Sequence, residues 1–487
     1  MTTANQKKFK GEIERYLLKT SYHFDSKIKE VFESLKTRTC LCQSNIIKHD
    51  GYQAAHILFV LIMFPLLKLE SIHTFCNKHW YSWSVGKKDT FYRFKNSSSY
   101  RWRTFLYKIN QRIFEKIEYT KTELKDRYFL IDDSILQKAG KLIENVSYIY
   151  DHSSGKSVLG YCITVLGAFT NHGTYILDFA YCFGKKQHRR SVQTTGVQKR
   201  TAIGKRITEA RKHSKLVLAE QMIKQAISKG FVPGYILFDS WYAWPSFIEA
   251  LRKIAQKTHI ICRLKQVKEN HRFYHHEGKA YALNALYKKV KKQFKKDRKT
   301  GLELARANVT LEGTNISAVI IFSKGYKEPV LDQISGKKQE KKSDWAAFLS
   351  TDITLHSATV IMKYTKRWSI EVCFKECKQS LRLGKDQSNS FNAQLAATTI
   401  SFLRYNFLNF LNQIENYQTL GELFNGLVDD TAVVTYAHRL YEFFVGLFRL
   451  SLSKIFQMLN LTEDFNDYLN TLTAELTGML AFKGCET

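Results

Sequence analysis

The chain has 487 residues, and its 75 Lys and Arg exceed its 44 Asp and Glu to give a formal net charge of +31. This length predicts about three domains with ample material for a core. The basic residues are spread along the chain and not gathered beside an anchor, which argues against an anionic membrane surface as the partner. Nucleic acid is therefore the first candidate.

The N-terminal segment and the cysteines indicate a reducing, cytoplasmic compartment. The chain starts without an apolar signal core, which argues against secretion. Nine scattered cysteines, an odd number, do not indicate a disulfide framework. Neither Cys40-x-Cys42 nor Cys373-x3-Cys377 has a second Cys or His pair at zinc spacing, so no zinc site is expected. The longest apolar run, 57–67, is too short to span a bilayer and predicts a buried helix.

Residues 1–120 are predicted to form a helical region that binds DNA. Segments 86–96 and 100–107 would be two helices joined by a serine turn, with Asp89 capping the first. The basic side chains of this pair include Arg101 and Arg103. Two interpretations stay open, a helix-turn-helix-like DNA-binding unit and a plain helical bundle with a basic surface.

From about residue 127 the pattern becomes extended. The apolar run 128–134 ends in Asp132, Asp133 and Ser134, which predicts a buried strand whose end reaches a polar site. Runs 157–170 and 173–183 meet at an Asn-His-Gly turn and predict a hairpin. Asp178, in the middle of the second run, is a rival acid that we interpret as a paired or edge position.

A basic loop is predicted at 185–212, mobile until it meets phosphates. Its candidate DNA contacts are Arg189, Arg190, Lys199 and Arg200. An amphipathic helix at 215–229 follows, and then a second apolar run that ends in Asp239. A helix at 244–256 and a strand at 259–264 complete an alternating α/β pattern.

Residues 265–350 interrupt this alternation and predict a β-rich insertion. Strand-like pieces lie at 305–311, 317–322 and 345–350. Trp345, on the last of them, is interpreted as core packing, with stacking on a flipped base as the alternative. The segment after residue 384 is helical again, with apolar residues at helical spacing.

The segment from Ser357, a candidate N-cap, to Lys378 predicts a helix with a charged face. At about 100° per residue, one polar stripe lies beside an apolar one. The polar stripe contains Tyr364, Arg367, Glu371, Lys375 and Lys378. Taken alone, this stripe is typical of an ordinary solvated surface with ion pairs at a spacing of four.

Three acids are candidate metal ligands because of their positions. Asp133 and Asp239 lie at the ends of predicted buried strands, and Glu371 lies on a helix beside a core. Carboxylates that converge repel one another unless a cation lies between them. Oxygen ligands of this kind suit Mg²⁺ or Mn²⁺, and two such ions about 4 Å apart can activate a water or a 3′-hydroxyl for attack on a phosphodiester.

The spacing Tyr364-x2-Arg367-x3-Glu371-x6-Lys378 resembles the tyrosine–arginine–glutamate–lysine signature of bacterial insertion-sequence transposases of the DDE type. Segments 130–134 and 237–239 also resemble the two aspartate motifs of that family. The resemblance covers residues 125–412.

The resemblance implies a ribonuclease H-like domain in which Asp133, Asp239 and Glu371 hold two Mg²⁺ or Mn²⁺ ions. It further implies that Tyr364, Arg367 and Lys378 contact phosphates, and Lys375 shares their stripe. Asp132 and Asp133 point to opposite faces of a strand, so one of them joins the site. We predict Asp133, because Ser134 supplies the small hydroxyl residue that follows the catalytic aspartate in family members.

The pattern predicts an α/β core with a β-rich insertion and flanking helical regions, and the resemblance implies that this core is ribonuclease H-like. The expected parts are a helical region (1–120), the core (121–264 and 351–412), the insertion (265–350) and a C-terminal helical region (413–487). We expect a cut-and-paste DNA transposase, or alternatively a non-catalytic DNA-binding protein derived from one. Terminal inverted repeats and target DNA would be its partners, without membrane or small-molecule substrate. It would form a homodimer during synapsis and associate with the bacterial nucleoid.

Overall fold

The computed structural model describes residues 27–78, 86–152, 154–184, 191, 198–266, 273–298, 300–326, 345–415, 419–431 and 451. The chain divides into two compact units. One comprises Lys27–Pro65 and Val85–Phe424, and contains the candidate site. The other comprises Met1–Ser26, Leu66–Ser84 and Asn425–Thr487, and includes helix α5 (Ile72–Lys78).

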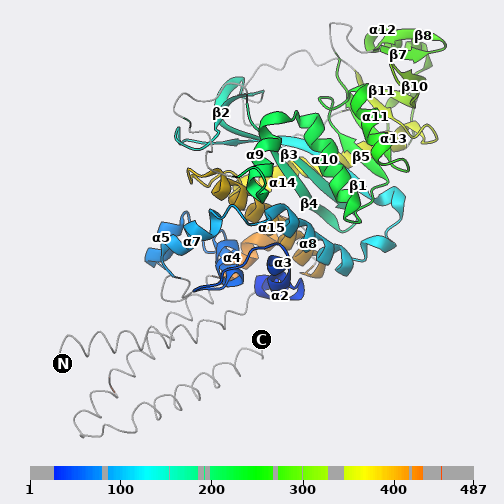
Figure 1. Cartoon of the computed structure of the whole chain (residues 1–487). Helices are drawn as coiled ribbons and strands as arrows, with labels where there is room; N and C mark the ends of the chain where they lie inside the picture. The colour runs from blue at the N-terminus through cyan, green and yellow to red at the C-terminus, as the bar shows by residue number, and fades with distance from the viewer. Residues whose placement is uncertain are drawn as a thin grey trace, which may run out of the picture. The chain divides into compact units, whose positions relative to one another are not determined.

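A mixed sheet of 12 strands runs through the first unit (Figure 1). Its order is β2-β3-β1-β5-β6-β12-β11-β10-β7-β8, with β4 paired to β3 and β9 paired to β10. The strands of the predicted core are β1 (Tyr128–Gln137), β2 (Ser147–Asp151), β3 (Lys156–Thr170), β4 (Gly173–Cys182), β5 (Tyr235–Phe238) and β6 (His259–Leu264). The strands of the insertion are β7 (Phe273–His276), β8 (Lys279–Ala282), β9 (Lys295–Lys296), β10 (Glu303–Leu311), β11 (Ser317–Lys324) and β12 (Trp345–Ser350).

Three parallel strands form the middle of this sheet. β1 pairs in parallel with β5, and β5 with β6. All four residues of β5 are buried, as expected of a strand covered on both faces. The ladder pairs Ile131 of β1 with Phe238 of β5, so the acids that follow these two residues belong to neighbouring strands at the same level.

The predicted hairpin is confirmed as β3 and β4, which pair antiparallel up to the turn between Thr170 and Gly173. β4 is the outer strand at this point of the sheet, and side chains from two helices satisfy its free backbone groups. Asn406 accepts from the Ile176 N–H at 2.8 Å and donates to the Ile176 carbonyl at 2.9 Å. Asn110 donates to the same carbonyl at 2.8 Å. The exposed edge is thereby closed to pairing with another strand.

Helices pack on both faces of the sheet, which confirms the α/β class. α10 packs on β3 and β4, and α14 on β1. The helices that precede β1 are α2 (Lys27–Ser34), α3 (Thr37–Gln43), α4 (Ala54–Met63), α7 (Lys88–Lys95) and α8 (Trp102–Lys116), with short 3₁₀ turns η1 (Tyr119–Lys121) and η2 (Leu124–Asp126). The later ones are α9 (Ala202–Lys212), α10 (Lys215–Ser228), α11 (Pro245–Ile254), α12 (Leu283–Val290), η3 (Lys291–Gln293), α13 (Ser357–Tyr364), η4 (Thr365–Arg367), α14 (Trp368–Gln379) and α15 (Phe391–Glu415). None of the described helices has the length and apolarity needed to cross a bilayer.

The apolar run at 57–67 begins inside α4, whose side chains are almost all buried, as predicted. α7 and α8 confirm the two helices expected on either side of the serine turn. The predicted cap of the first is wrong, because Lys87 is the N-cap of α7 and Asp89 lies in its first turn. A carboxylate there still faces the positive end of the helix dipole.

The basic loop predicted at 185–212 is wrong in its last part, where α9 forms. Thr201 caps this helix by accepting from the Gly204 N–H. Ile203, Ile207 and Ala210 form a buried stripe against β4. The many Lys and Arg residues of this segment led to the prediction of a loop, although the apolar residues recur at helical spacing.

The helix predicted from Ser357 to Lys378 is interrupted. Its N-cap is His356 and not Ser357, because the His356 ring accepts from the Ala358 N–H. A 3₁₀ turn, η4, then separates α13 from α14. This turn tightens the backbone between Tyr364 and Trp368, so the five polar residues do not share one continuous α-helical stripe.

The segment predicted as an insertion is β-rich and extends the core sheet, because β12 pairs antiparallel with β6. The Trp345 ring at the start of β12 stacks on Tyr287, with centroids 4.3 Å apart and planes at 10°. Phe322 packs edge-on against the same indole at 5.4 Å. These contacts favour the packing interpretation of Trp345 over base stacking.

Candidate active site

Asp239 directly follows β5, whereas Asp132 and Asp133 lie in the middle of β1, which continues to Gln137, so the predicted strand end at these two acids is wrong. In the parallel ladder Ile131 pairs with Phe238, and the next residues along are Asp132 and Asp239. Registered partners in parallel strands project to the same face, so the pairing aligns Asp132, and not Asp133, with Asp239. Asp239 also accepts from the backbone N–H of Trp241 at 2.6 Å, which shapes the turn after β5.

Arg367 joins Asp132 to Glu371. Its Nη1 lies 3.1 Å from Asp132 Oδ2, and its Nη2 lies 2.5 Å from Glu371 Oε1. The guanidinium is buried, with a side-chain exposure of 5%. Burial acts to lower the pKa of Arg367, but the neighbouring Tyr364, Asp132 and Glu371 outweigh it and raise that pKa. The middle of β1 and the start of α14 are thus connected by one buried cation.

The pKa of Asp132 depends on the other charged residues of this group. Burial raises the pKa of its carboxyl to about 8, and the charges of Asp133, Asp239 and Glu371 add to the rise while Arg367 opposes it. The pKa of Asp132 is therefore raised by the charge of each of the other predicted acids of the site. A carboxyl in this position gains from an added cation, because a positive neighbour offsets the cost of its burial.

Asp133 lies on the opposite face of β1, with a different set of partners. Its Oδ2 forms an ion pair with Lys215 of α10 at 2.8 Å and lies 3.7 Å from the Cys162 sulfur. The Tyr242 hydroxyl donates to its Oδ1 at 3.5 Å. The prediction of Asp133 over Asp132 rested on Ser134 alone. The register between β1 and β5 is the signal that favours Asp132, and one strand read by itself does not contain it.

The residues predicted to contact phosphates differ in their accessibility. The Tyr364 ring is 2% exposed and packs on Phe348 at 5.0 Å, with the Arg367 guanidinium 5.5 Å from its centroid. Lys375 and Lys378 are half-buried, and burial lowers the pKa of Lys378. Those that are exposed are Arg101, Lys199 and Arg200. Arg189 and Arg190 lie outside the described residues.

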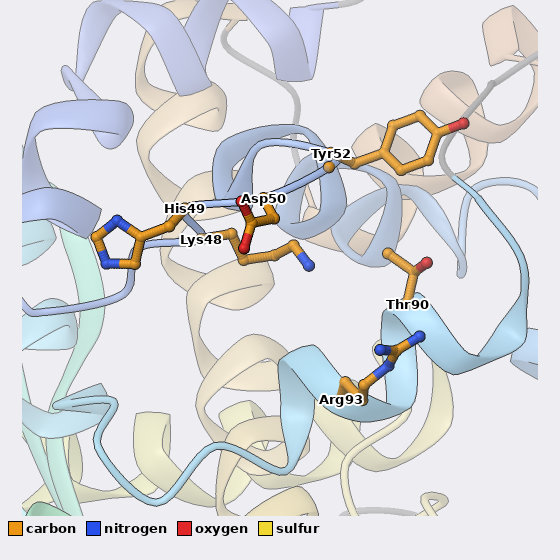
Figure 2. Close-up of a pocket in the computed structure, with 7 residues that line it drawn as sticks. Lys48, His49, Asp50, Tyr52, Thr90 and Arg93 are labelled. Atoms are coloured by element: carbon orange, nitrogen blue, oxygen red, sulfur yellow. The ribbon is translucent and has the colours of Figure 1, made fainter.

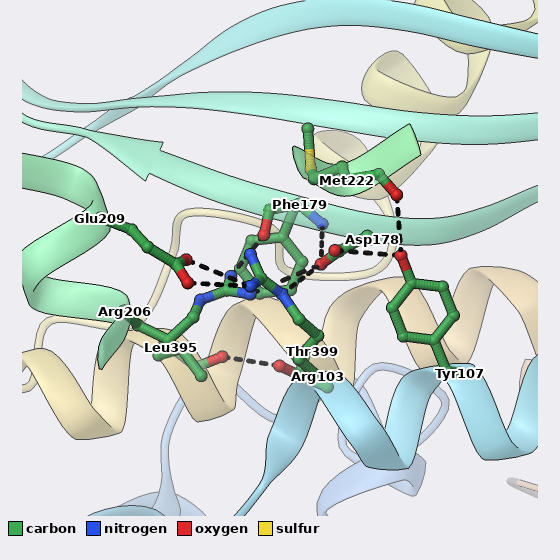
Figure 3. Close-up of polar contacts among 9 residues, drawn as sticks. All are labelled: Arg103, Tyr107, Asp178, Phe179, Arg206, Glu209, Met222, Leu395 and Thr399. Atoms are coloured by element: carbon green, nitrogen blue, oxygen red, sulfur yellow. Dashed lines mark hydrogen bonds and ion pairs between the residues drawn. The ribbon is translucent and has the colours of Figure 1, made fainter. Parts of the chain in front are cut away.

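Arg103 belongs to a buried network on β4 and not to an open basic surface (Figure 3). Its Nε lies 3.0 Å from Asp178 Oδ1, and its Nη1 lies 3.1 Å from Glu209 Oε2. Arg206 Nη1 and the Tyr107 hydroxyl reach the same Asp178 carboxylate at 3.4 and 3.1 Å. Asp178 is therefore a paired residue, as predicted. The DNA contact of Arg103 stays a prediction, and it would require this guanidinium to leave two carboxylates.

A pocket of about 510 Å³ lies between the loop that precedes α4 and the first turns of α7 (Figure 2). Figure 2 shows Lys48 and Arg93 extending toward a common space beside Thr90, with Asp50 on the same side. Its other lining residues are His49, Gly51 and Tyr52. The cations are suited to a phosphate, whereas the Asp50 carboxylate opposes one.

The donor set at the candidate site is chemically suited to a hard divalent cation, since Asp132, Asp239 and Glu371 offer carboxylate oxygens. Within the described ranges, however, no three His, Cys, Asp or Glu side chains lie close enough together to hold one ion. The Arg367 guanidinium contacts both Asp132 and Glu371. In this structure the shared partner of Asp132 and Glu371 is therefore the Arg367 guanidinium.

Residues 164–407, about half of the chain, match the family described as the transposase DDE domain. The chain belongs to this family. Membership implies a ribonuclease H-like fold, with which the mixed sheet and its helices are consistent, and it supports a transposase, a nuclease-type enzyme that acts on DNA. Transposases of this kind generally use divalent metal ions. The matched range includes Asp239 and Glu371 and begins after β1, so it does not test the choice between Asp132 and Asp133. A search of curated proteins gave no match.

Proposed function

We propose that this transposase belongs to a bacterial insertion sequence, carries the tyrosine–arginine–glutamate–lysine signature and moves DNA by a cut-and-paste route. Hydrolysis at the element's ends would free a 3′-hydroxyl, which would then attack target DNA at the same site. One observation carries this proposal. Arg367 contacts both Asp132 and Glu371, and the register of β1 against β5 aligns Asp132 with Asp239. This connection supports a site formed by acids that lie far apart in the sequence.

Asp132, Asp239 and Glu371 are proposed as the catalytic carboxylates, with Asp133 as the alternative first acid. They would hold two Mg²⁺ or Mn²⁺ ions, which when bound supply the charge that activates a water or a 3′-hydroxyl for in-line attack. Asp132 must lose its proton to serve as a ligand, and Glu371 must exchange Arg367 for the ion. The Arg367 guanidinium is then available, beside the reacting groups, for a phosphate oxygen.

The remaining contacts are proposed from charge and exposure. Lys375 and Lys378 follow Glu371 along α14, while Lys199, Arg200 and Arg101 are exposed cations on other elements. Such cations hold the phosphate backbone without reading its sequence. The two ends of an element must be held together, so we propose a homodimer on DNA in the bacterial cytoplasm.

The test is incubation of the protein with duplexes that carry the element's terminal inverted repeats, with Mg²⁺ or Mn²⁺, followed by mapping of the cut. Cleavage at the repeat's end supports the proposal. A second candidate, a non-catalytic DNA-binding protein, predicts salt-sensitive binding to the same duplex without any cut. The acids favour the enzyme, because buried carboxyls with a strongly raised pKa, such as that of Asp132, gather at catalytic sites.

A further inference from the structure

An exposed indole lies on the same turn as a proposed catalytic carboxylate. Trp241 is 44% exposed, whereas the neighbouring Tyr242 is fully buried. The Trp241 backbone N–H donates to Asp239 Oδ1 at 2.6 Å, so the position of this turn and that of the carboxylate are coupled. Part of the Trp241 ring therefore faces solvent two residues from a proposed catalytic acid.

The indole is held by its neighbours. Lys215 Nζ lies 4.7 Å from its centroid, and the Tyr242 ring packs edge-on at 4.9 Å. Both neighbours are in turn fixed by Asp133, through the 2.8 Å ion pair with Lys215 and the 3.5 Å hydrogen bond from Tyr242. Asp133 thus anchors the two groups that support the Trp241 ring. A ring fixed in this way loses little side-chain entropy when a ligand stacks on it.

The surroundings indicate the kind of ligand. A nucleotide presents the flat π-face of its base, and here an exposed indole lies two residues from Asp239, a proposed catalytic carboxylate. We propose that Trp241 stacks on a nucleobase next to the scissile phosphate. Lys215 and Asp133 are positioning residues that hold the ring in place. This inference rests on the proposed function, because it places the base at the site where the strand is cut.

The experiment uses the full-length protein and a terminal-repeat duplex with 2-aminopurine at single positions around the cut, in Ca²⁺ to allow binding without cleavage. The variants are Trp241→Ala, Trp241→Phe and a matched control, Trp244→Ala. Trp244 is 40% exposed and lies three residues further along, at the start of α11. Stacking on one base contributes enough that Trp241→Ala should bind about 5- to 100-fold more weakly. The aminopurine signal at one position should also be lost.

Trp241→Phe retains an aromatic face and should keep the aminopurine response, while Trp244→Ala should stay within about twofold of the wild-type affinity. The inference is overturned if Trp241→Ala binds as the wild type does, or if Trp244→Ala loses as much. It is also overturned if the wild-type protein binds no end duplex. If the response requires Trp241 but Mg²⁺ and Mn²⁺ produce no cut, the stacking of Trp241 on a nucleobase stands, and the proposed cleavage fails together with the scissile position of that base.

Discussion

Asp178 is predicted to be one of the largest single contributors to stability among the polar side chains of β4. Its side chain is 1% exposed and is shared by Arg103 and Arg206, whose side chains are 17% and 8% exposed. Burial already lowers the pKa of Arg206 to about 10, so its charged form depends on the carboxylate nearby. Asp178→Asn keeps the shape and removes the charge. Breaking a buried pair from one side costs about 3–5 kcal/mol, because the remaining cation stays buried.

The assay is urea unfolding of the full-length protein, followed by tryptophan fluorescence, with the free energy taken from the transition midpoint at constant slope. The matched control is Glu115→Gln, which removes a carboxylate from an ion pair with Arg112 at 2.9 Å. Those side chains are 35% and 61% exposed, so the control should lose about 0.5 kcal/mol or less. A loss below about 1 kcal/mol for Asp178→Asn, or an equal loss for both variants, would refute the reasoning.

Two further predictions concern Asp132. In gel assays of end cleavage, Asp132→Asn should abolish the cut and Asp133→Asn should leave a measurable rate. The reverse outcome would show that Asp133, and not Asp132, is the first catalytic aspartate. Because burial raises the pKa of Asp132 to about 8, the folded protein holds a proton there that the unfolded chain releases near pH 4. Without metal, the contribution of this group to stability should therefore fall as the pH rises from about 4 to about 8. Metal must displace the same proton, so stabilisation by Mg²⁺ in thermal unfolding should increase over the upper part of that window. A pH dependence that persists in Asp132→Asn would contradict this assignment.

Local patterns in the sequence predicted most elements of the core. The apolar runs of β1 and β5 are strands because each is buried on both sides, and the Asn-His-Gly turn closes the β3–β4 hairpin. The extension of the sheet by β12 was not predicted, since pairing between distant strands leaves no local signal. α9 was missed because its cations, Arg206 among them, were all interpreted as solvent-facing.

The candidate site was predicted in its residue types and less well in its geometry. Asp239 and Glu371 follow from strand ends and helical spacing. The choice between Asp132 and Asp133 depends on the register of β1 against β5, which two separate runs of sequence do not define. The 3₁₀ turn η4 was not predicted, because the sequence was interpreted as one continuous α-helix. This turn changes the directions of Tyr364 and Arg367 relative to Glu371. Arg367 was predicted to contact phosphate, and in this structure its partners are two carboxylates.

The most direct test of the account is metal-dependent cleavage of the element's ends by Asp239→Asn and Glu371→Gln. Both substitutions keep the size of the side chain and remove its charge. We expect the wild-type protein to cut the terminal-repeat duplex in Mg²⁺ or Mn²⁺. Each variant should bind the duplex with affinity close to the wild type and leave it intact. Efficient cleavage by either variant would contradict the assignment of these carboxylates to the reaction.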